Sequence, residues 1–216
     1  MLKKRAAERA LGRAVSTGGD FAEIFYEDTR SSRIGQTDDR IDTATTGRIH
    51  GAGLRVYKGT NSVYVHTNDT SDAGLMAVAE RAADAVGSVR GEDRQIQLSG
   101  SIVKNIHEIR ELPMDVSGER RRALVREACR AARAESAEIA HVTGALWDWE
   151  QAVTIANTEG MFVSDQRVYT RASVTAVASG KGENQTGSES PGAMMGFELF
   201  STCLLYTSPS PRDGLL

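Results

Sequence analysis

The stretch Gly51-Ala-Gly-Leu-Arg-Val-Tyr57, followed by Lys58-Gly-Thr-Asn61 and Ser62-Val-Tyr-Val-His66, decides the fold of the first half of the chain. Apolar and polar residues alternate on both sides of a short glycine-containing segment, which is the pattern of a β-hairpin. Directly after it, Asn68-Asp-Thr-Ser71 offers several N-cap residues for a helix over residues 72–86. The predicted buried side of this helix consists of apolar residues at helical spacing: Leu75, Val78, Ala79, Ala82 and Val86.

Toward the amino terminus, residues 2–15 have the spacing of an amphipathic helix that Gly18-Gly19 would end. Strand-like segments follow at 21–27, 31–36 and 40–46, with Asp38 and Asp39 as turn residues between the last two. We therefore expect residues 1–94 to form a first module in which helices pack on a mainly antiparallel sheet.

The second half repeats this scheme without an exact sequence repeat. Residues 87–94 read as a connection and 95–112 as irregular or extended, and Ser117 is the expected N-cap of a helix that ends near Ala134. Its predicted apolar face is Leu124, Val125, Ala128, Ala131 and Ala132. Strands are expected at 139–149, 151–156 and 169–178, with a turn at 157–160 and a polar loop at 180–185. Residues 95–202 are thus predicted to form a second module, and both modules belong to the α+β class.

The last segment differs from the rest of the chain. Cys203-Leu-Leu-Tyr-Thr-Ser-Pro-Ser-Pro-Arg-Asp213 resembles the translated read-through of a transposase sequencing adapter. We therefore expect the natural sequence to stop near Thr202 and residues 203–216 to be a non-native tail, the alternative being a genuine Ser/Pro-rich tail. Without Cys203 only Cys129 remains, so no disulfide is expected within this segment and a reducing cytoplasm is the predicted compartment.

Composition excludes several classes of protein. The 216 residues are 40% hydrophobic and 25% charged, which is typical of globular domains. A net charge of -3 predicts no general attraction to nucleic acid or to anionic membranes. No apolar run is long enough to cross a bilayer, and the charged amino terminus lacks the apolar core of a signal peptide.

The histidines do not form a recognisable metal motif. His107-Glu108 begins the pattern of a helical zinc site, but no second histidine follows and Pro113 would break the helix. His50, His66 and His141 stand apart and are interpreted as surface or packed residues. We predict no metal ligand and no catalytic residue in this chain, and its substrate-binding residues stay unassigned.

Glycine-rich segments do not match phosphate-binding loops either. Gly47-Arg-Ile-His-Gly51-Ala-Gly53 would precede a strand, whereas a dinucleotide-binding loop follows a strand and opens a helix. Gly180-Lys181-Gly182 lacks the spacing and the Ser/Thr of a P-loop. Both are interpreted as glycines at turns or at close backbone approaches.

The second predicted helix carries arginines that could bind an acidic partner. These are Arg120, Arg121, Arg122, Arg126, Arg130 and Arg133. Because Glu119, Glu127, Glu135 and Glu138 interleave and no aromatic residue could stack on a base, we interpret this side as a solvated face with ion pairs.

Three further residues receive structural interpretations. Cys129 lies beside the apolar stripe and is read as a small buried hydrophobe rather than a nucleophile. Trp147 and Trp149 share one face of a strand and are expected to pack against a helix or a neighbouring subunit. The chain also lacks the Gly-x-Ser-x-Gly pattern of a nucleophile elbow.

An ordered set of weak motifs carries a family resemblance. Residues 18–26, Asp39-Arg-Ile41 and the hairpin from Gly51, followed by a helix near Ser71, resemble the amino-terminal region of the TldD/PmbA family. The second half agrees in Val142-Thr-Gly-Ala-Leu146 and in three further segments. These are Ala156-Asn-Thr-Glu-Gly160, Arg171-Ala-Ser-Val-Thr-Ala-Val177 and Gly196-Phe-Glu-Leu-Phe200. The resemblance covers nearly all of residues 18–200.

The resemblance implies a cytoplasmic TldD-type zinc metallopeptidase acting in proteolysis or peptide maturation. Its zinc would be held in a later domain by a His-Glu-x-x-x-His helix and a further ligand, the Glu acting as general base on metal-bound water. None of those residues lies in this sequence, so the fragment alone is expected to be inactive and to bind no zinc. The resemblance also implies a heterodimer with a TldE/PmbA-type partner, peptides or unfolded polypeptides as substrates, and neither nucleic acid nor membrane as partner.

Two alternatives remain open. The chain could be the non-catalytic PmbA/TldE-type partner, which has the same front half and lacks the metal motif. A third reading is a stand-alone α+β binding module, which predicts a natural stop codon close to Thr202.

Overall fold

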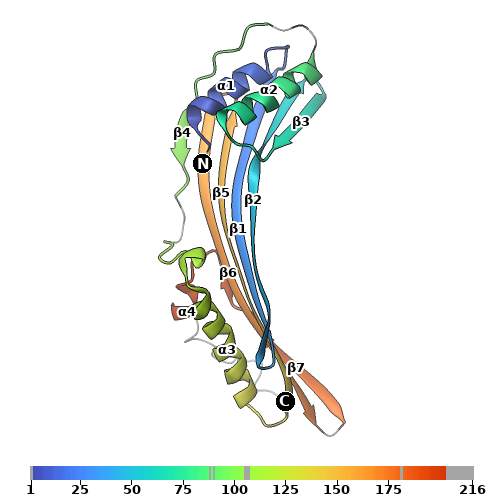
Figure 1. The fold of residues 1–216 in the computed structure, drawn as a ribbon, viewed down its shortest axis with the longest axis vertical. Coiled ribbons are helices and arrows are strands. Elements are labelled where there is room, and N and C mark those ends of the chain that lie inside the picture. Colours follow the sequence, from blue (N-terminus) through green and yellow to red (C-terminus); the bar gives the residue numbers. More distant parts are fainter. Residues whose placement is uncertain (1, 88, 90, 105–107, 181, 203–216) are drawn as a thin grey trace, which may run out of the picture. The chain divides into compact units, whose positions relative to one another are not determined.

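The computed structural model describes residues 2–87, 89, 91–104, 108–180 and 182–202 (Figure 1). The adapter-like segment 203–216, His107 and Lys181 therefore lie outside the described residues. The elements are α1 (Lys4–Ala14), β1 (Phe21–Thr37), β2 (Arg40–Lys58), β3 (Asn61–Thr67), α2 (Asp72–Val86), β4 (Ser99–Ile102), the 3-10 turn η1 (Pro113–Asp115), α3 (Gly118–Ala134), β5 (Ile139–Asn157), β6 (Met161–Gly180), β7 (Glu183–Glu189), β8 (Gly192–Ala193) and α4 (Leu199–Thr202).

The strands form a sheet with the order β3-β2-β1-β5-β6-β4, in which β7 and β8 also pair with β6. The β2–β3, β6–β7 and β6–β8 pairs are antiparallel, and β4 runs parallel to β6. Helices on a mainly antiparallel sheet confirm the predicted α+β class.

Two compact units share these strands. Unit 1 comprises Met1–Thr29, Arg48–Asn105 and Gln151–Arg167, and unit 2 comprises Arg30–Gly47, Ile106–Glu150 and Val168–Leu216. Each of β1, β2, β5 and β6 contributes one part to each unit. The units thus interleave along the chain, and the consecutive module bounds 1–94 and 95–202 stay a prediction.

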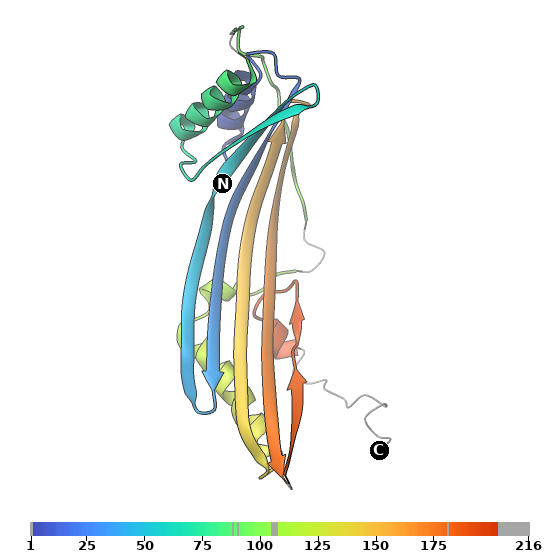
Figure 2. The same cartoon turned by 90° about the vertical axis from the view of Figure 1, so that its right-hand side faces the viewer.

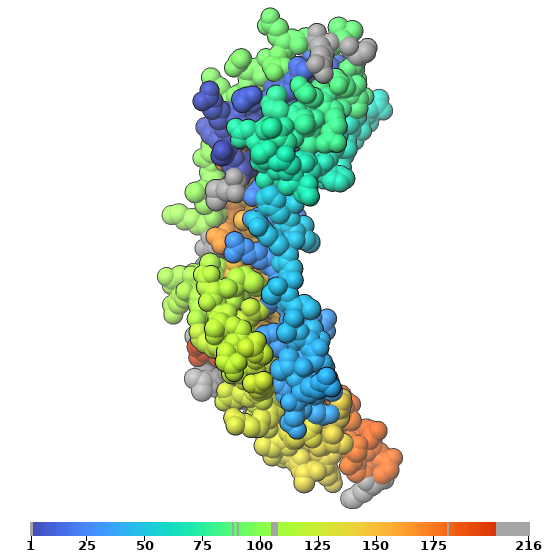
Figure 3. All heavy atoms as spheres, in the orientation of Figure 1, coloured from blue at the N-terminus to red at the C-terminus, as the bar shows by residue number. Residues whose placement is uncertain are grey.

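In unit 1, α1 and α2 lie side by side, as the ribbon and the space-filling view both show (Figures 1 and 3). Their apolar sides pack with inward residues of the strands, and the fully buried centre includes Leu11, Ile24, Leu54, Val56 and Val78. The apolar stripe predicted for α2 is therefore the one that the structure buries, with Val86 partly buried at the end of the helix.

The predicted hairpin and the start of α2 are confirmed. Lys58 pairs with Asn61 across a two-residue turn, in which Gly59 has φ 56°, a left-handed conformation that favours glycine. Ser71 caps α2, since its Oγ accepts a hydrogen bond of 3.1 Å from the Gly74 backbone N–H.

In unit 2, α3 covers one side of the strands (Figure 2). Ser117 caps this helix as predicted, its Oγ accepting from the Arg120 backbone N–H at 3.2 Å. The buried side of α3 is Arg121, Val125 and Cys129. The predicted apolar face is therefore displaced, because Ala131 is exposed and Cys129 lies in the centre of the contact.

The strands are longer than the sequence predicts. Segments expected to be separate at 21–27 and 31–36, at 40–46 and 51–57, and at 139–149 and 151–156 are continuous in β1, β2 and β5, respectively. Likewise β6 begins at Met161, and part of the predicted polar loop at 180–185 belongs to β7. Cross-strand pairing explains these differences, since backbone hydrogen bonds to a neighbouring strand keep polar segments extended whatever their own propensity. In β7, all seven residues pair with β6 beyond a turn in which Gly182 has φ 82°.

Candidate functional site

The histidines of the described residues occupy separate settings. His50 Nε2 lies 3.4 Å from the Tyr26 hydroxyl and 3.3 Å from the Thr70 hydroxyl. His66 stacks on Tyr64 with ring centroids 6.1 Å apart, and the third, His141, is paired with an aspartate in unit 2. Across the described ranges, no group of three or more His, Cys, Asp and Glu could hold a metal ion. The side chains of the described residues therefore do not fit a zinc site.

The glycine-rich segment at Gly51 and the buried Cys129 both have structural roles. Gly51 and Gly53 lie within β2, so the glycine-rich segment is part of a strand instead of preceding one. A Cβ on Gly51 would lie 2.7 Å from the Thr67 carbonyl oxygen. The two backbones therefore approach so closely that only glycine fits at this position. Cys129 is 3% exposed, and burial raises the pKa of its thiol, which makes it a poor nucleophile.

The arginines of α3 divide into two groups. Arg122 and Arg126 pair with Glu119 on the exposed flank, at 3.0 and 3.7 Å, as expected of a solvated face. Arg121 differs, because its side chain is buried and its Nη2 lies 3.2 Å from Asp148 Oδ2. The pattern of charges along the helix does not distinguish Arg121 from its neighbours.

Asp148 is the centre of a buried polar cluster in unit 2. Its side chain is 1% exposed and accepts a hydrogen bond of 3.2 Å from the Ser32 hydroxyl. Burial raises the pKa of Asp148 to about 6, against the opposing attraction of Arg121 and the Ser32 hydrogen bond. Next to it on the same face of β5, buried Glu150 accepts from the Met114 backbone N–H at 2.8 Å. The cluster ties α3 and the segment before it to the sheet.

A signal for this cluster was present in the sequence. Along β5 the inward positions alternate through Val142, Gly144 and Leu146, so the same alternation places Asp148 and Glu150 inside. Charged residues at inward positions require partners. The alternation therefore predicts a buried ion pair, although it does not identify Arg121.

Trp147 and Trp149 share the opposite face of β5, as predicted. Both are half-buried; the Arg33 guanidinium lies 5.3 Å from the Trp147 ring centre, and Trp149 stacks on Tyr169 at 6.0 Å. Within the described residues this row has its own strand neighbours as partners, and no helix of the chain is shown against it. Packing against a neighbouring subunit stays a prediction.

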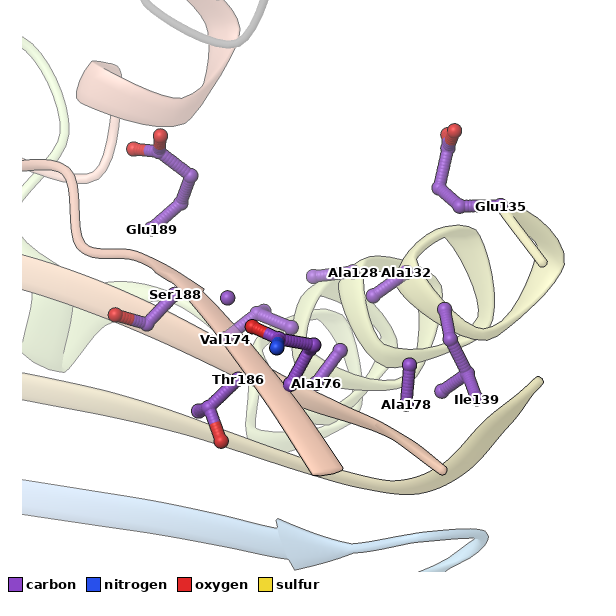
Figure 4. Close-up of a pocket in the computed structure, with 12 residues that line it drawn as sticks. Ala128, Ala132, Glu135, Ile139, Val174, Ala176, Ala178, Thr186, Ser188 and Glu189 are labelled. Carbon is purple, nitrogen blue, oxygen red and sulfur yellow. The ribbon is translucent and has the colours of Figure 1, made fainter. Parts of the chain in front are cut away.

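An apolar groove lies between α3 and the β6–β7 hairpin, with a volume of about 640 Å³ (Figure 4). Its lining residues are Ala128, Ala132, Glu135, Ile139, Val174, Ala176, Ala178, Gln185, Thr186, Gly187, Ser188 and Glu189. The lining offers contact surface and two carboxylates, without a nucleophile–base pair or a metal-ligand set. This groove thus offers a surface suited to binding.

A second hollow, of about 800 Å³, lies in unit 1 beside β4. Its lining includes Ile102, Val103, Val153 and Phe162, and Ile102 is largely exposed. Among the described residues, no helix has the length and apolarity that crossing a bilayer requires.

Comparison with protein-family models gives two matches along the chain. Residues 22–86 match the PmbA/TldA metallopeptidase domain 1, and residues 111–207 match the PmbA/TldA metallopeptidase central domain. The second match runs into the segment 203–216, so the adapter-like origin of that segment stays a prediction.

Individual relatives agree with these matches. The chain is 27% identical over 180 residues to a metalloprotease of Methanothermobacter thermautotrophicus, which covers 83% of this chain and 39% of that protein. Its fold is similar to that of a candidate modulator of a DNA gyrase from Thermotoga maritima, with a TM-score of 0.70, 16% identity and coverage of 89% of this chain and 43% of the other. TldE from Thermococcus kodakarensis gives a TM-score of 0.65 at 14% identity, covering 88% and 43%. The chain thus spans about two fifths of the length of these relatives.

Proposed function

The chain belongs to the PmbA/TldD metallopeptidase family, and we propose that it is the amino-terminal portion of a TldD-type zinc metallopeptidase that acts in proteolysis or peptide maturation. One observation carries the proposal: the chain matches the first and central domain models of a metallopeptidase family, whereas its described residues contain no cluster of metal ligands. In this proposal the catalytic zinc domain belongs to sequence outside this chain.

In this proposal the two units have binding and structural roles in a cytoplasmic enzyme. They contribute to the wall of a chamber that admits peptides or unfolded polypeptides, and they contact a TldE/PmbA-type partner subunit. Neither nucleic acid nor membrane is a proposed partner. Two features support such roles. The buried Arg121–Asp148 pair holds α3 on the sheet, and the apolar groove offers a contact surface.

Metal analysis of the purified 216-residue chain tests the assignment of the zinc site. We expect well under one zinc per chain after dialysis against excess zinc, no change in melting temperature on adding a chelator, and no cleavage of casein or short peptides. A full equivalent of tightly bound zinc, or chelator-sensitive peptidase activity, would place the catalytic site within this chain and overturn the proposal.

The non-catalytic PmbA/TldE-type subunit is the second candidate, supported by the shared fold of the TldE structure. Sequencing the gene beyond the codon for Thr202 in a long-read assembly separates the two. A downstream His-Glu-x-x-x-His motif supports the peptidase, and a downstream domain without it supports the partner subunit. A natural stop codon at that point would instead favour the stand-alone binding module.

A further inference from the structure

The groove beside α3 in unit 2 is uncharged on its floor and acidic at its rim. Val174, Ala176 and Ala178 of β6 form the floor, and Ala128 and Ala132 form the helical wall. Glu135 and Glu189 stand at its two ends, with carboxylates that point away from the strands (Figure 4). The lining residues, all of them described, include no lysine, arginine or histidine.

Three arginines of α3 lie on its other flank, whereas Arg121 shares the stripe of Ala128 and is buried in its pair with Asp148. At 100° per residue, Arg122, Arg126 and Arg133 share the side of the helix opposite to Ala128 and Glu135. Arg133 pairs there with Asp38 of the β1–β2 turn. The groove side of α3 is therefore electrostatically separate from its basic side, and a cation entering the groove meets carboxylates only.

A second helix packed next to α3 would lie at the open side of the groove. Helices that pack side by side are about 8–10 Å apart, and neighbouring strands are about 4.7–4.9 Å apart. A helix adjacent to α3 is therefore centred about two strands further along the sheet. Since α3 packs on Val142 and Leu146 of β5, the next helix position lies over β7, at the open side of the groove. The short side chains of Ala128 and Ala132, one turn apart, permit close approach of that helix.

We propose that this groove binds an amphipathic helix from a second, non-identical polypeptide, with small aliphatic residues on one stripe and lysine or arginine beside the stripe. Helix-in-groove recognition supplies the apolar contact, and Glu135 and Glu189 select the positive flanks. This inference does not rest on the proposed peptidase activity, since it concerns binding by the described residues alone.

A second copy of this chain is a poor occupant for two reasons. The apolar sides of α1, α2 and α3 are already buried within their own units, so none of these helices offers a free stripe. Strand pairing between two copies through the exposed strand β7 is disfavoured in the antiparallel register that pairs all seven residues. An antiparallel β7–β7 pair centred on Thr186 would set Glu183 against Glu189 at both ends, and like charges directly opposite each other destabilise a sheet.

Two synthetic peptides of 16 residues probe the site on the 216-residue chain. One has a leucine/alanine stripe with lysines on both flanks, and its match has glutamate at every lysine position. We expect the lysine peptide to bind about 5- to 30-fold more tightly than the glutamate peptide and to become helical on binding, as measured by fluorescence anisotropy and circular dichroism.

Charge reversal of the rim tests the electrostatic selection. Glu135→Lys/Glu189→Lys should lower affinity for the lysine peptide by about 5- to 30-fold. The control Glu92→Lys/Glu159→Lys changes the net charge equally at exposed sites of unit 1 and should leave affinity within about twofold. Equal losses in both double variants would show nonspecific charge attraction and overturn the proposal.

Filling the groove tests the apolar contact. A Cβ on Gly187 meets open space, so Gly187→Leu adds a side chain on the groove side of β7 without a clash inside the fold. We expect this variant to weaken the lysine peptide about tenfold or more. Asn184→Leu is the matched control, because Asn184 is an exposed position of the same strand that does not line the groove and alternates to the other face, and it should have little effect. Thermal melts verify folding of each variant.

Two results would overturn the proposal that the groove binds an amphipathic helix of another polypeptide. If the lysine peptide shows no saturable binding at millimolar concentration, the groove is not a helix-binding site. Concentration-dependent dimerisation in analytical ultracentrifugation that Gly187→Leu abolishes would assign the groove to a second copy instead.

Discussion

Replacing Asp148 by Asn should stabilise the folded chain at neutral and alkaline pH. Burial, partly opposed by Arg121 and Ser32, raises the pKa of Asp148 to about 6 from an ordinary value of 3.8. A folded-state pKa above the unfolded value means that the folded state favours the protonated acid. The stabilisation from this group is therefore complete below pH 3.8 and is lost as the pH rises through about 6. Asn has the shape of the neutral acid, can still accept from Ser32 and does not ionise.

The size of the effect follows from the two pKa values. The interval from 3.8 to about 6 corresponds to about 3 kcal/mol, which is the expected gain of Asp148→Asn at pH 8. At pH 4, where Asp148 is protonated in the folded state and about half protonated in the unfolded state, the expected gain falls to about 0.5 kcal/mol. For a chain of this length, 3 kcal/mol is a rise in melting temperature of about 6–12 °C.

Urea unfolding at pH 4 and pH 8, followed by circular dichroism, measures the difference between the wild-type chain and the variant. The decisive quantity is the change of that difference with pH, because all other titrating groups are common to both proteins. Arg121→Met is the complementary variant, since loss of the guanidinium should raise the pKa of Asp148 further and steepen the pH dependence. An Asp148→Asn variant that is destabilised more at pH 8 than at pH 4 would refute the reasoning, because it would show that the ionised pair is itself stabilising. A difference that does not change with pH would also refute it, because it would show that the pKa of Asp148 is not raised.

Three further predictions concern helix ends, packing and the buried thiol. Ser71→Ala and Ser117→Ala should each lower the free energy of unfolding by about 1 kcal/mol, because each hydroxyl accepts a bond from an otherwise unpaired N–H; urea titration measures this. Gly144→Ala should cost about 1–3 kcal/mol, because its Cβ would overlap the Cys129 Sγ, and the cost should shrink in a Cys129→Ala background; additive costs would contradict that contact. In a Cys203→Ser chain, Ellman's reagent should label Cys129 only as fast as the fold opens, and immediate labelling of the native chain would disprove its burial.

Features set by neighbouring residues could be predicted from the sequence. Ser71 and Ser117 precede amphipathic segments and cap the helices expected of them. The turn at Gly59 closes between two alternating runs, and its register follows from the turn length. In each case the hydrogen bonds that define the feature join residues a few positions apart, so a short window of sequence contains the cause.

Features set by distant residues could not be predicted in the same way. The polar centre of β1 has no apolar alternation, and it is held extended by partners such as Arg48 of β2, which forms two hydrogen bonds of 2.8 Å to Asp28. Strand β7 has seven exposed residues and owes its conformation to pairing with β6. The groove depends on the same pairing, because β7 supplies one of its sides. The groove could therefore not be predicted without the strand.

The position of α3 on the sheet also depends on distant polar contacts. In the middle of the helix the contact is made by short side chains facing Gly144, and small groups alone allow a helix to shift along its axis. Polar attachments near both ends restrict that shift: Arg121 pairs with Asp148, and Arg133 pairs with Asp38. The two arginines are twelve residues apart, about 18 Å along the helix, so a displacement by one turn would break both pairs and leave Asp148 buried without its cation. The buried pair therefore specifies where α3 lies even though ionisation of Asp148 lowers stability, and the wall of the groove formed by α3 is placed by the same two contacts.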